Sequence, residues 1–253
     1  MTIRRDASGA RPDRDGAAGA RPDRDGVTLA IDASSSLGTV AVLRGGVVVA
    51  EDAVPMRGEH EERLFPAIAA ALAESRSPVR EIARVVCGAG PGSFTSLRMA
   101  AAIAKGVAFG NSAVARETPL FPVSSLMLIV TAHASSHVPG RYLALLDAMR
   151  DERYAALVEV RADGRVVGLE PPNGGRIATH DTALWCDRLQ ARAIGPLEAI
   201  EALPHARGVA QLLADIIAGG AVSVDTWEPT YGRLAEAQVR WEAQYGRALV
   251  GDG

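Results

Sequence analysis

A glycine-rich segment, residues 88–98, has residue types that could bind an anion. It reads Gly-Ala-Gly-Pro-Gly-Ser-Phe-Thr-Ser-Leu-Arg, follows a short apolar run and precedes a long helical pattern. Glycines allow the backbone to adopt positive φ and to direct N–H groups at an anion, and the N-terminus of the helix adds a partial positive charge. Gly90, Gly92 and Ser93 are therefore candidate phosphate-binding residues.

The same segment matches neither of the two common nucleotide-binding motifs. No Gly-Lys-Ser/Thr triplet ends it, which excludes a Walker A loop, and Ser93 stands where a dinucleotide fingerprint needs its third glycine. A structural interpretation also stays open, in which Ser93 or Thr95 caps the following helix and the glycines only permit the turn.

Asp32 is a second candidate for phosphate chemistry. It ends an apolar, β-branched run at residues 27–31 and is followed by a serine-rich turn. A carboxylate at the C-terminal end of a strand can hold a hydrated magnesium ion beside phosphates. Aspartate is equally common at the start of a turn, where it bonds its own backbone. The sequence alone leaves both interpretations open.

The histidines do not form a recognisable metal site. His133 and His137 have the i, i+4 spacing that places two imidazoles on one helical face, but the glutamate of an H-E-x-x-H motif is missing. A Pro-Gly pair at residues 139–140 also indicates a fraying helix end. His60 has no second histidine one turn away, and we interpret it as a surface or interface residue. We expect no metal site, and the absence of a G-x-S-x-G elbow leaves a hydrolase triad without an anchor.

The elements that must position these residues follow one pattern twice. The first set of strand patterns covers residues 27–31, 38–43 and 47–51, and the second covers residues 142–146, 153–160 and 165–169. In each set the first strand ends in aspartate, at Asp32 and Asp147. This arrangement resembles the actin, sugar kinase and Hsp70 superfamily. We therefore expect an α/β, two-lobed actin-like ATPase (ASKHA, ribonuclease H-like) fold, each lobe a three-strand meander plus βα crossovers.

The composition fits two lobes preceded by a tail. The 253 residues are 48% hydrophobic and 23% charged, which is typical of a soluble α/β protein of this size. We expect an N-terminal actin-like lobe at residues 27–137 and a smaller C-terminal lobe at residues 138–253. Residues 1–26 contain GARPDRDG twice and have no apolar period, so we expect a disordered tail there.

Charge and cysteine content limit the partners and the compartment. A net charge of −3 argues against a domain that holds nucleic acid by itself, because such domains usually carry a basic surface. The longest uncharged stretch, residues 118–140, is interrupted by prolines and polar residues, so we expect no membrane span. Cys87 and Cys186 form no C-x-x-C pair, which excludes a disulfide framework and a zinc ribbon. A cytoplasmic protein is expected.

Two helical patterns flank the glycine-rich segment. Residues 59–73 are amphipathic, with Leu64, Ile68 and Leu72 at four-residue spacing. The helix after the segment is rich in small residues, namely Ala100, Ala101, Ala102, Ala104, Gly106 and Ala108. Small side chains favour close packing against a second helix, from the same chain or from a partner.

Residues 90–98, with Ala-Lys-Gly at 104–106, are similar to the GPGSFTGLR…AKGLA signature of the TsaB (YeaZ) family. Other blocks that resemble this family lie at residues 60–66, 122–126, 147–154 and 228–236, so the resemblance covers residues 27–241. Two departures lie inside matching blocks. Ser96 replaces the usual glycine, and Met149-Arg150-Asp151 replaces the usual Arg-x-Gly.

The resemblance implies a non-catalytic scaffold and dimerisation subunit of the bacterial complex that attaches threonylcarbamoyl to N6 of adenosine 37 in tRNAs reading codons that start with A. In that complex the paralogue TsaD holds the metal and transfers the carbamoyl group, TsaE is a small ATPase, and tRNA would meet this chain only through the complex. The implied partner interface comprises Leu97, Arg98, Ala101 and Lys105, with His60 and Leu64 from the preceding helix. A homodimer of the isolated chain is expected through the same surface.

The resemblance also implies that this chain has no catalytic residue, no metal and no required cofactor. The H-x-x-x-H metal pair of TsaD corresponds here to Ser125 and Ile129, and neither can replace an imidazole ligand. Weak ATP or ADP binding in the complex stays open, through Asp32, Gly90, Gly92 and Ser93. Two alternatives were weighed. A small-molecule kinase of the actin-like superfamily would need an adenosine loop in the second lobe, and a glycoprotease-like metallopeptidase would need a metal ligand set; neither is found in the sequence.

Overall fold

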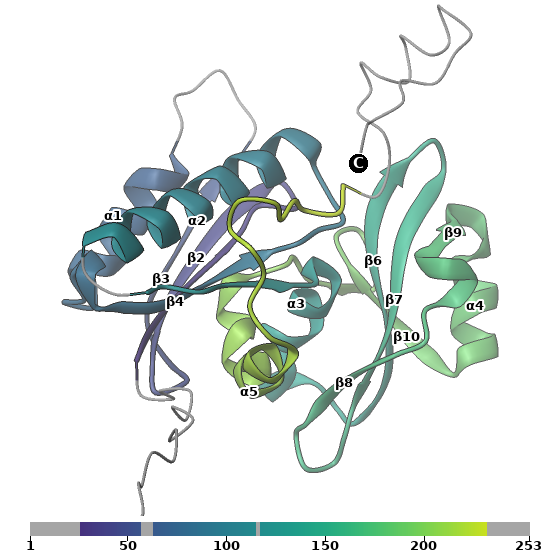
Figure 1. Cartoon of the computed structure of the whole chain (residues 1–253). Helices are drawn as coiled ribbons and strands as arrows, with labels where there is room; N and C mark the ends of the chain where they lie inside the picture. The colour runs from purple at the N-terminus through teal and green to yellow at the C-terminus, as the bar shows by residue number, and fades with distance from the viewer. Residues whose placement is uncertain (1–25, 57–62, 115–116, 232–253) are drawn as a thin grey trace, which may run out of the picture.

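The computed structural model describes residues 26–56, 63–114 and 117–231, which form two sheets surrounded by helices (Figure 1). The predicted tail at residues 1–26 lies outside the described residues except for Gly26, and so does His60. Among the residues that the structure describes, no helix is both long and apolar enough to cross a membrane.

The first sheet contains the first predicted meander and the two parallel strands that follow it. Its strands are β1 (Val27–Asp32), β2 (Leu37–Arg44), β3 (Val47–Pro55), β4 (Ile82–Gly88) and β5 (Leu120–Val123). They are ordered β3-β2-β1-β4-β5, with antiparallel pairing from β1 to β3 and parallel pairing from β1 through β4 to β5. The C-terminal ends of β1 and β4 therefore lie side by side, next to the start of the glycine-rich segment.

Helices cover both faces of the first sheet. α1 (Leu64–Glu74) and α2 (Phe94–Val114) pack on one face, and α5 (Val209–Gly219) packs on the other. Side chains alternate along β1, so that Leu29 and Ile31 face α1 and α2 while Ala30 faces α5. α5 comes from the C-terminal part of the chain, so residues beyond the predicted lobe boundary at 137/138 cover one face of the first sheet. The division of the chain into lobes at this boundary stays a prediction.

The second sheet contains the second predicted meander. Its strands are β6 (Gly140–Met149), β7 (Glu152–Val160), β8 (Val166–Leu169), β9 (Arg176–Ala178), β10 (Ala191–Gly195) and β11 (Ile200–Glu201). The order is β11-β10-β6-β7-β8, and β9 pairs with β7. α4 (Thr182–Leu189) packs on one face through Trp185 and Leu189. Short 3-10 turns connect these elements at Val79–Glu81, Ala134–Ser136, Pro172–Gly175, Thr179–Asp181 and Ala206–Gly208.

α3 (Ser125–Thr131) lies between the two sheets and belongs to both cores. Leu128 packs with residues of the first sheet and α5, whereas Ile129 and Val130 pack with the second sheet. The helix ends at Thr131, and a 3-10 turn separates His133 from His137, so the i, i+4 spacing of these two residues does not lie on an α-helix.

The turn between β6 and β7 is unusual because three consecutive residues other than glycine have positive φ. Met149, Arg150 and Asp151 have φ values of 62°, 53° and 60°. In the family pattern that the sequence resembles, a glycine stands at the third of these positions, Asp151, and glycine adopts such a conformation without steric cost. Each side chain in the left-handed region costs about 1–2 kcal/mol. Three side chains with positive φ thus make this turn energetically less favourable than a turn with glycine would be.

Candidate functional site

The predicted phosphate-binding residues do converge, at the adjoining ends of β1 and β4. Asp32 ends β1, and the glycine-rich segment begins where β4 ends, at Gly88. Gly88 lies so close to Asp32 that a Cβ atom added to it would overlap the carboxylate. The geometry therefore brings together Asp32 and the glycine-rich segment, as the sequence predicted.

The Asp32 carboxylate is fully buried and is bonded by the protein itself. Ser34 donates to Oδ1 from its backbone N at 3.0 Å and from Oγ at 2.7 Å, and Ser125 Oγ donates to Oδ2 at 2.6 Å. Burial raises the pKa of the Asp32 carboxyl above its ordinary value, while these hydrogen bonds act in the opposite direction. The two oxygens are thus directed at hydroxyl and amide donors of the same chain, in the geometry of a structural network.

The glycine-rich segment contacts its own chain in the same way. The backbone N of Gly90 donates to Ser125 Oγ at 3.2 Å, and the backbone N of Ser93 donates to the carbonyl oxygen of Ser34 at 2.8 Å. A Cβ atom at Gly92 would overlap the Ser34 carbonyl, and one at Gly90, where φ is +86°, would overlap the Thr230 carbonyl. These glycines therefore permit close packing of backbone on backbone. Nucleotide binding by these residues stays a prediction.

Serines complete the start of α2. Ser93 Oγ and Ser96 Oγ lie 3.0 Å apart, and the Ser93 carbonyl accepts the first helical hydrogen bond from Leu97 N at 2.9 Å. Ser96, which replaces the glycine of the family pattern, is buried and uses its hydroxyl in this contact. The substitution thus adds a local hydrogen bond at the beginning of the helix.

The two positions that correspond to metal ligands in TsaD have structural roles here. Ser125 bonds Asp32, and Ile129 is fully buried in the core of the second sheet. The rings of His133 and His137 lie 6.4 Å apart, and His137 packs against Tyr142 at 4.9 Å. Within residues 26–56, 63–114 and 117–231, no group of three or more His, Cys, Asp or Glu side chains could hold a metal ion.

The predicted partner interface is only partly on the surface. Leu97 and Leu64 are fully buried and Ala101 is 3% exposed, so these three residues pack inside the protein and cannot contact a partner directly. Arg98 is exposed, and Lys105 is half-buried, with an ion pair from its Nζ to Glu228 Oε1 at 3.0 Å.

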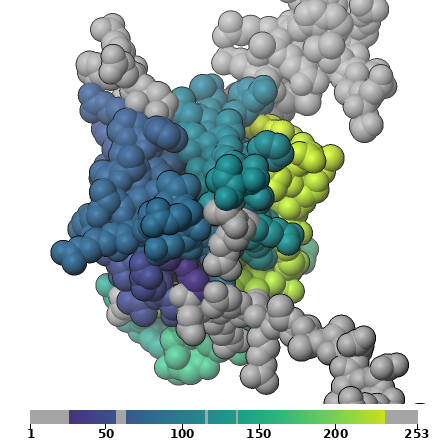
Figure 2. All heavy atoms as spheres, turned by 60° about the vertical axis from the view of Figure 1, so that its left-hand side comes forward, coloured from purple at the N-terminus to yellow at the C-terminus, as the bar shows by residue number. Residues whose placement is uncertain are grey.

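The exposed surface of α1 and α2 differs from the predicted interface. Phe65 is exposed where Leu64 was predicted, and Ala102 is exposed where Ala101 was predicted. We call this surface the α1–α2 face and define it by Phe65, Arg98, Ala102 and Phe109. Phe65 is 59% and Phe109 67% exposed, which is unusual for large apolar side chains. Both helices lie on the same side of the first sheet, and their blue and teal atoms adjoin in Figure 2. The spacing alone could not show which side of α2 faces the sheet.

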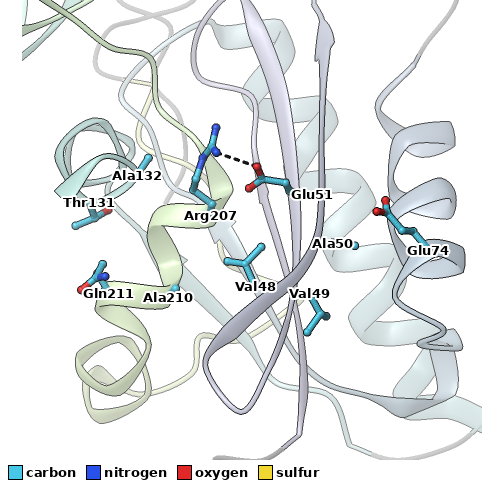
Figure 3. A pocket seen from close by; sticks show the side chains of 10 residues that line it. All are labelled: Val48, Val49, Ala50, Glu51, Glu74, Thr131, Ala132, Arg207, Ala210 and Gln211. Carbon is cyan, nitrogen blue, oxygen red and sulfur yellow. Dashed lines mark hydrogen bonds and ion pairs between the residues drawn. The ribbon is translucent and has the colours of Figure 1, made fainter. Parts of the chain in front are cut away.

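A separate cavity, which the sequence analysis missed, lies beside β3 and α5 (Figure 3). Its volume is about 510 Å³, and the ion pair between Arg207 Nη1 and Glu51 Oε1, at 2.8 Å, crosses it. His205 lies next to Arg207, and burial together with this cation lowers its pKa to about 4. No motif signals this cavity, because its lining comes from residues far apart in the sequence.

Comparisons with known proteins agree with this geometry. A family model described as "TsaD: tRNA N6-adenosine threonylcarbamoyltransferase" matches residues 44–168. The chain is 33% identical to "tRNA threonylcarbamoyladenosine biosynthesis protein TsaB" of Haemophilus influenzae over 53% of this chain and 56% of that protein. It is 26% identical to the protein of the same name from Bacillus subtilis over 84% of this chain and 96% of that protein. The chain thus spans about half the length of the Haemophilus relative and nearly all of the Bacillus one.

Two solved structures share the fold. The structure titled "YeaZ from Pseudomonas aeruginosa" has a TM-score of 0.63 at 24% identity, covering 81% of this chain and 99% of that one. An uncharacterised protein "with similarity to peptidase YEAZ" from the same organism has a TM-score of 0.67, also at 24% identity, covering 82% and 100%. The predicted two-lobed, actin-like fold is therefore confirmed.

Proposed function

We propose that this chain is a member of the TsaB (YeaZ) family, within the Gcp-like, actin-like ATPase superfamily, and that it acts in threonylcarbamoyladenosine biosynthesis on tRNA as a non-catalytic subunit that binds and supports TsaD. The observation that carries this proposal is the exposed apolar α1–α2 face. The catalytic paralogue would supply the metal and perform the transfer, and this chain would supply a docking surface.

The shape of α2 supports helix-to-helix docking on that face. Ala102, Gly106, Gly110 and Ala113 follow one another at intervals of four, four and three residues, and all are exposed. A Cβ atom at Gly106 or Gly110 would meet nothing within 4 Å, so this strip is open to an approaching helix. Small residues let helix backbones approach closely, and Phe109 of α2 and Phe65 of α1 add exposed apolar side chains on the same side of the sheet.

The charge of the chain supports an indirect role toward tRNA. Its net charge of −3 differs from the net basic charge that is usual for domains that hold a polyanion on their own. We propose that tRNA and the ATPase TsaE meet this chain within a complex built around TsaD in the cytoplasm. The kinase alternative has no supporting observation among the described residues, because the hydrogen-bonding groups around Asp32 contact the chain itself.

The test is the association of this chain with TsaD from the same organism, measured by size-exclusion chromatography with light scattering. Ala102→Glu places a charged side chain on the exposed strip of α2 without entering the core, and we expect it to abolish the complex. Ala218→Glu, at an exposed position of α5 on the opposite face of the sheet, is the matched control and should leave the complex intact.

The outcomes separate clearly. A complex that is lost in Ala102→Glu and kept in Ala218→Glu supports docking through the α1–α2 face. If the wild-type chain forms no complex even with TsaE and ATP present, the proposed function is refuted.

A further inference from the structure

The segment that follows α5 runs between the two lobes and reaches α2. It leaves α5 and passes between the two sheets, as the yellow trace in Figure 1 shows. Val222 N donates to the Leu120 carbonyl at 2.9 Å, which fixes the segment to the first sheet. We call its last part, residues 227–231, the strap. Trp227, at its beginning, packs against the same core cluster as Ile103 and Val107 of α2.

The strap is attached to α2 at two well-separated points. The ring of Tyr231 lies 4.5 Å from the ring of Phe94, in the first turn of the helix. Tyr231 also donates its hydroxyl to Glu228 Oε2 at 2.9 Å, and the other oxygen of Glu228 pairs with Lys105 Nζ at 3.0 Å. Phe94 and Lys105 are separated by about 16 Å of helix at 1.5 Å per residue, so the strap spans about three turns of α2.

The strap is also attached to the glycine-rich segment and to the second lobe. Thr230 N donates to the Ala89 carbonyl at 2.7 Å, and the Thr230 carbonyl packs against Gly90. Tyr154, a buried residue of β7, donates its hydroxyl to the Tyr231 carbonyl at 3.4 Å. The position of Tyr231 is therefore determined by contacts from both lobes.

Tyr231 acts on the α1–α2 face through a stack of three side chains. The guanidinium of Arg98 lies 5.4 Å from the centre of the Phe94 ring, and Phe94 in turn contacts Tyr231. Arg98 is the exposed cation of the α1–α2 face, so the orientation of its side chain depends on the ring beneath it. Burial and the Glu228 carboxylate raise the pKa of Tyr231 to about 12, so the phenol remains a hydrogen-bond donor at neutral pH.

We propose that Tyr231 and Glu228 are positioning residues that hold the first turns of α2 and the Arg98 side chain in the conformation that binds the partner helix. This inference rests on the proposed function and adds to it: the strap, which lies outside both α1 and α2, sets the affinity of their shared face. The partner group that Arg98 would meet is an acidic side chain or a helix C-terminus, because these are the groups that pair with a guanidinium.

The experiment measures the dissociation constant for TsaD by calorimetry and the hydrogen exchange of residues 93–105 in the isolated chain. Tyr231→Ala should weaken binding about tenfold, because it removes the aromatic contact and the hydrogen bond to Glu228. It should also speed exchange in the first turns of α2 with no partner present. Tyr231→Phe keeps the ring and should restore binding to within about threefold of the wild type.

A double-mutant cycle separates positioning from a general loss of stability. If Tyr231 acts through Arg98, Tyr231→Ala should have little further effect on binding in an Arg98→Ala background. Glu228→Ala changes an exposed side chain and gives a second test should Tyr231→Ala fold poorly; we expect it to weaken binding about threefold. Leu184→Ala, at an exposed position of α4, serves as the control with unchanged affinity.

Different experimental results would overturn the positioning role of the strap and the proposed function. Strap variants that bind TsaD as tightly as the wild type, while Ala102→Glu does not bind, overturn the positioning role and leave the docking face intact. Additive effects of Tyr231→Ala and Arg98→Ala also overturn it. A wild-type chain that does not bind TsaD overturns both proposals.

Discussion

Removing the hydroxyl of Ser125 should destabilise the fold strongly, because this single oxygen links two buried groups. Ser125 Oγ donates to Asp32 Oδ2 at 2.6 Å and accepts from Gly90 N at 3.2 Å, and the residue is fully buried. Ser125→Ala leaves a buried carboxylate with one donor fewer, at about 1.5–3 kcal/mol, and a buried N–H without its acceptor, at about 1–3 kcal/mol. We expect the free energy of unfolding to fall by about 4 kcal/mol.

Urea unfolding followed by circular dichroism measures this loss, and the thermal midpoint should fall by roughly 12 °C, taking about 2–4 °C per kcal/mol for a protein of this size. Ser112→Ala is the matched control. Its Oγ accepts from Thr118 N at 2.9 Å on an exposed residue of α2, so its loss should stay below about 1 kcal/mol. A loss below about 1 kcal/mol for Ser125→Ala itself would refute the view that Asp32 depends on this network.

Two further predictions concern the same site and the adjoining helix. Gly92→Ala should lower the free energy of unfolding by about 2 kcal/mol or more, because its Cβ would overlap a backbone carbonyl. Gly106→Ala lies in open space on α2 and should raise the free energy of unfolding by about 0.5–1 kcal/mol. The denaturant midpoints of the two variants test this difference, and equal effects would contradict the packing described for the glycine-rich segment. The pKa of Asp32 is higher in the folded state than in the unfolded state. Its contribution to the free energy of unfolding is therefore fully present at pH values below the unfolded pKa and is lost as the pH rises through the folded pKa. Asp32→Asn should remove that loss, so that unfolding free energies measured from about pH 4 to about pH 8 decline less in the variant than in the wild type; an equal decline would show that Asp32 does not titrate in this way.

Much of the fold could be predicted because the signals for it are local. The strands β1 to β3 show β-branched residues, turn glycines and a terminal aspartate, and the same order recurs in β6 to β8. The helical spacing of Leu64, Ile68 and Leu72 correctly predicted the buried side of α1. These patterns follow from backbone periodicity and need no knowledge of distant contacts.

The candidate site was harder to predict because its geometry depends on tertiary contacts. Residues 100–102 of α2 are all alanine, so hydrophobicity does not distinguish Ala101, which is buried, from Ala102, which is exposed. The role of Asp32 was equally ambiguous, since the same residue suits a magnesium site and a turn. The residue that bonds its carboxylate, Ser125, lies 93 positions away in the sequence, so no local pattern could indicate this contact.

The sharing of α3 between two cores has a mechanical consequence. Actin-like proteins that respond to ligands do so by hinge or shear movement of one lobe against the other. Here such a movement would withdraw Leu128 from the first core or Ile129 from the second, and exposing either buried side chain costs about 1.5–3 kcal/mol. A small helix thus opposes movement of one lobe against the other, because its side chains are buried in both cores.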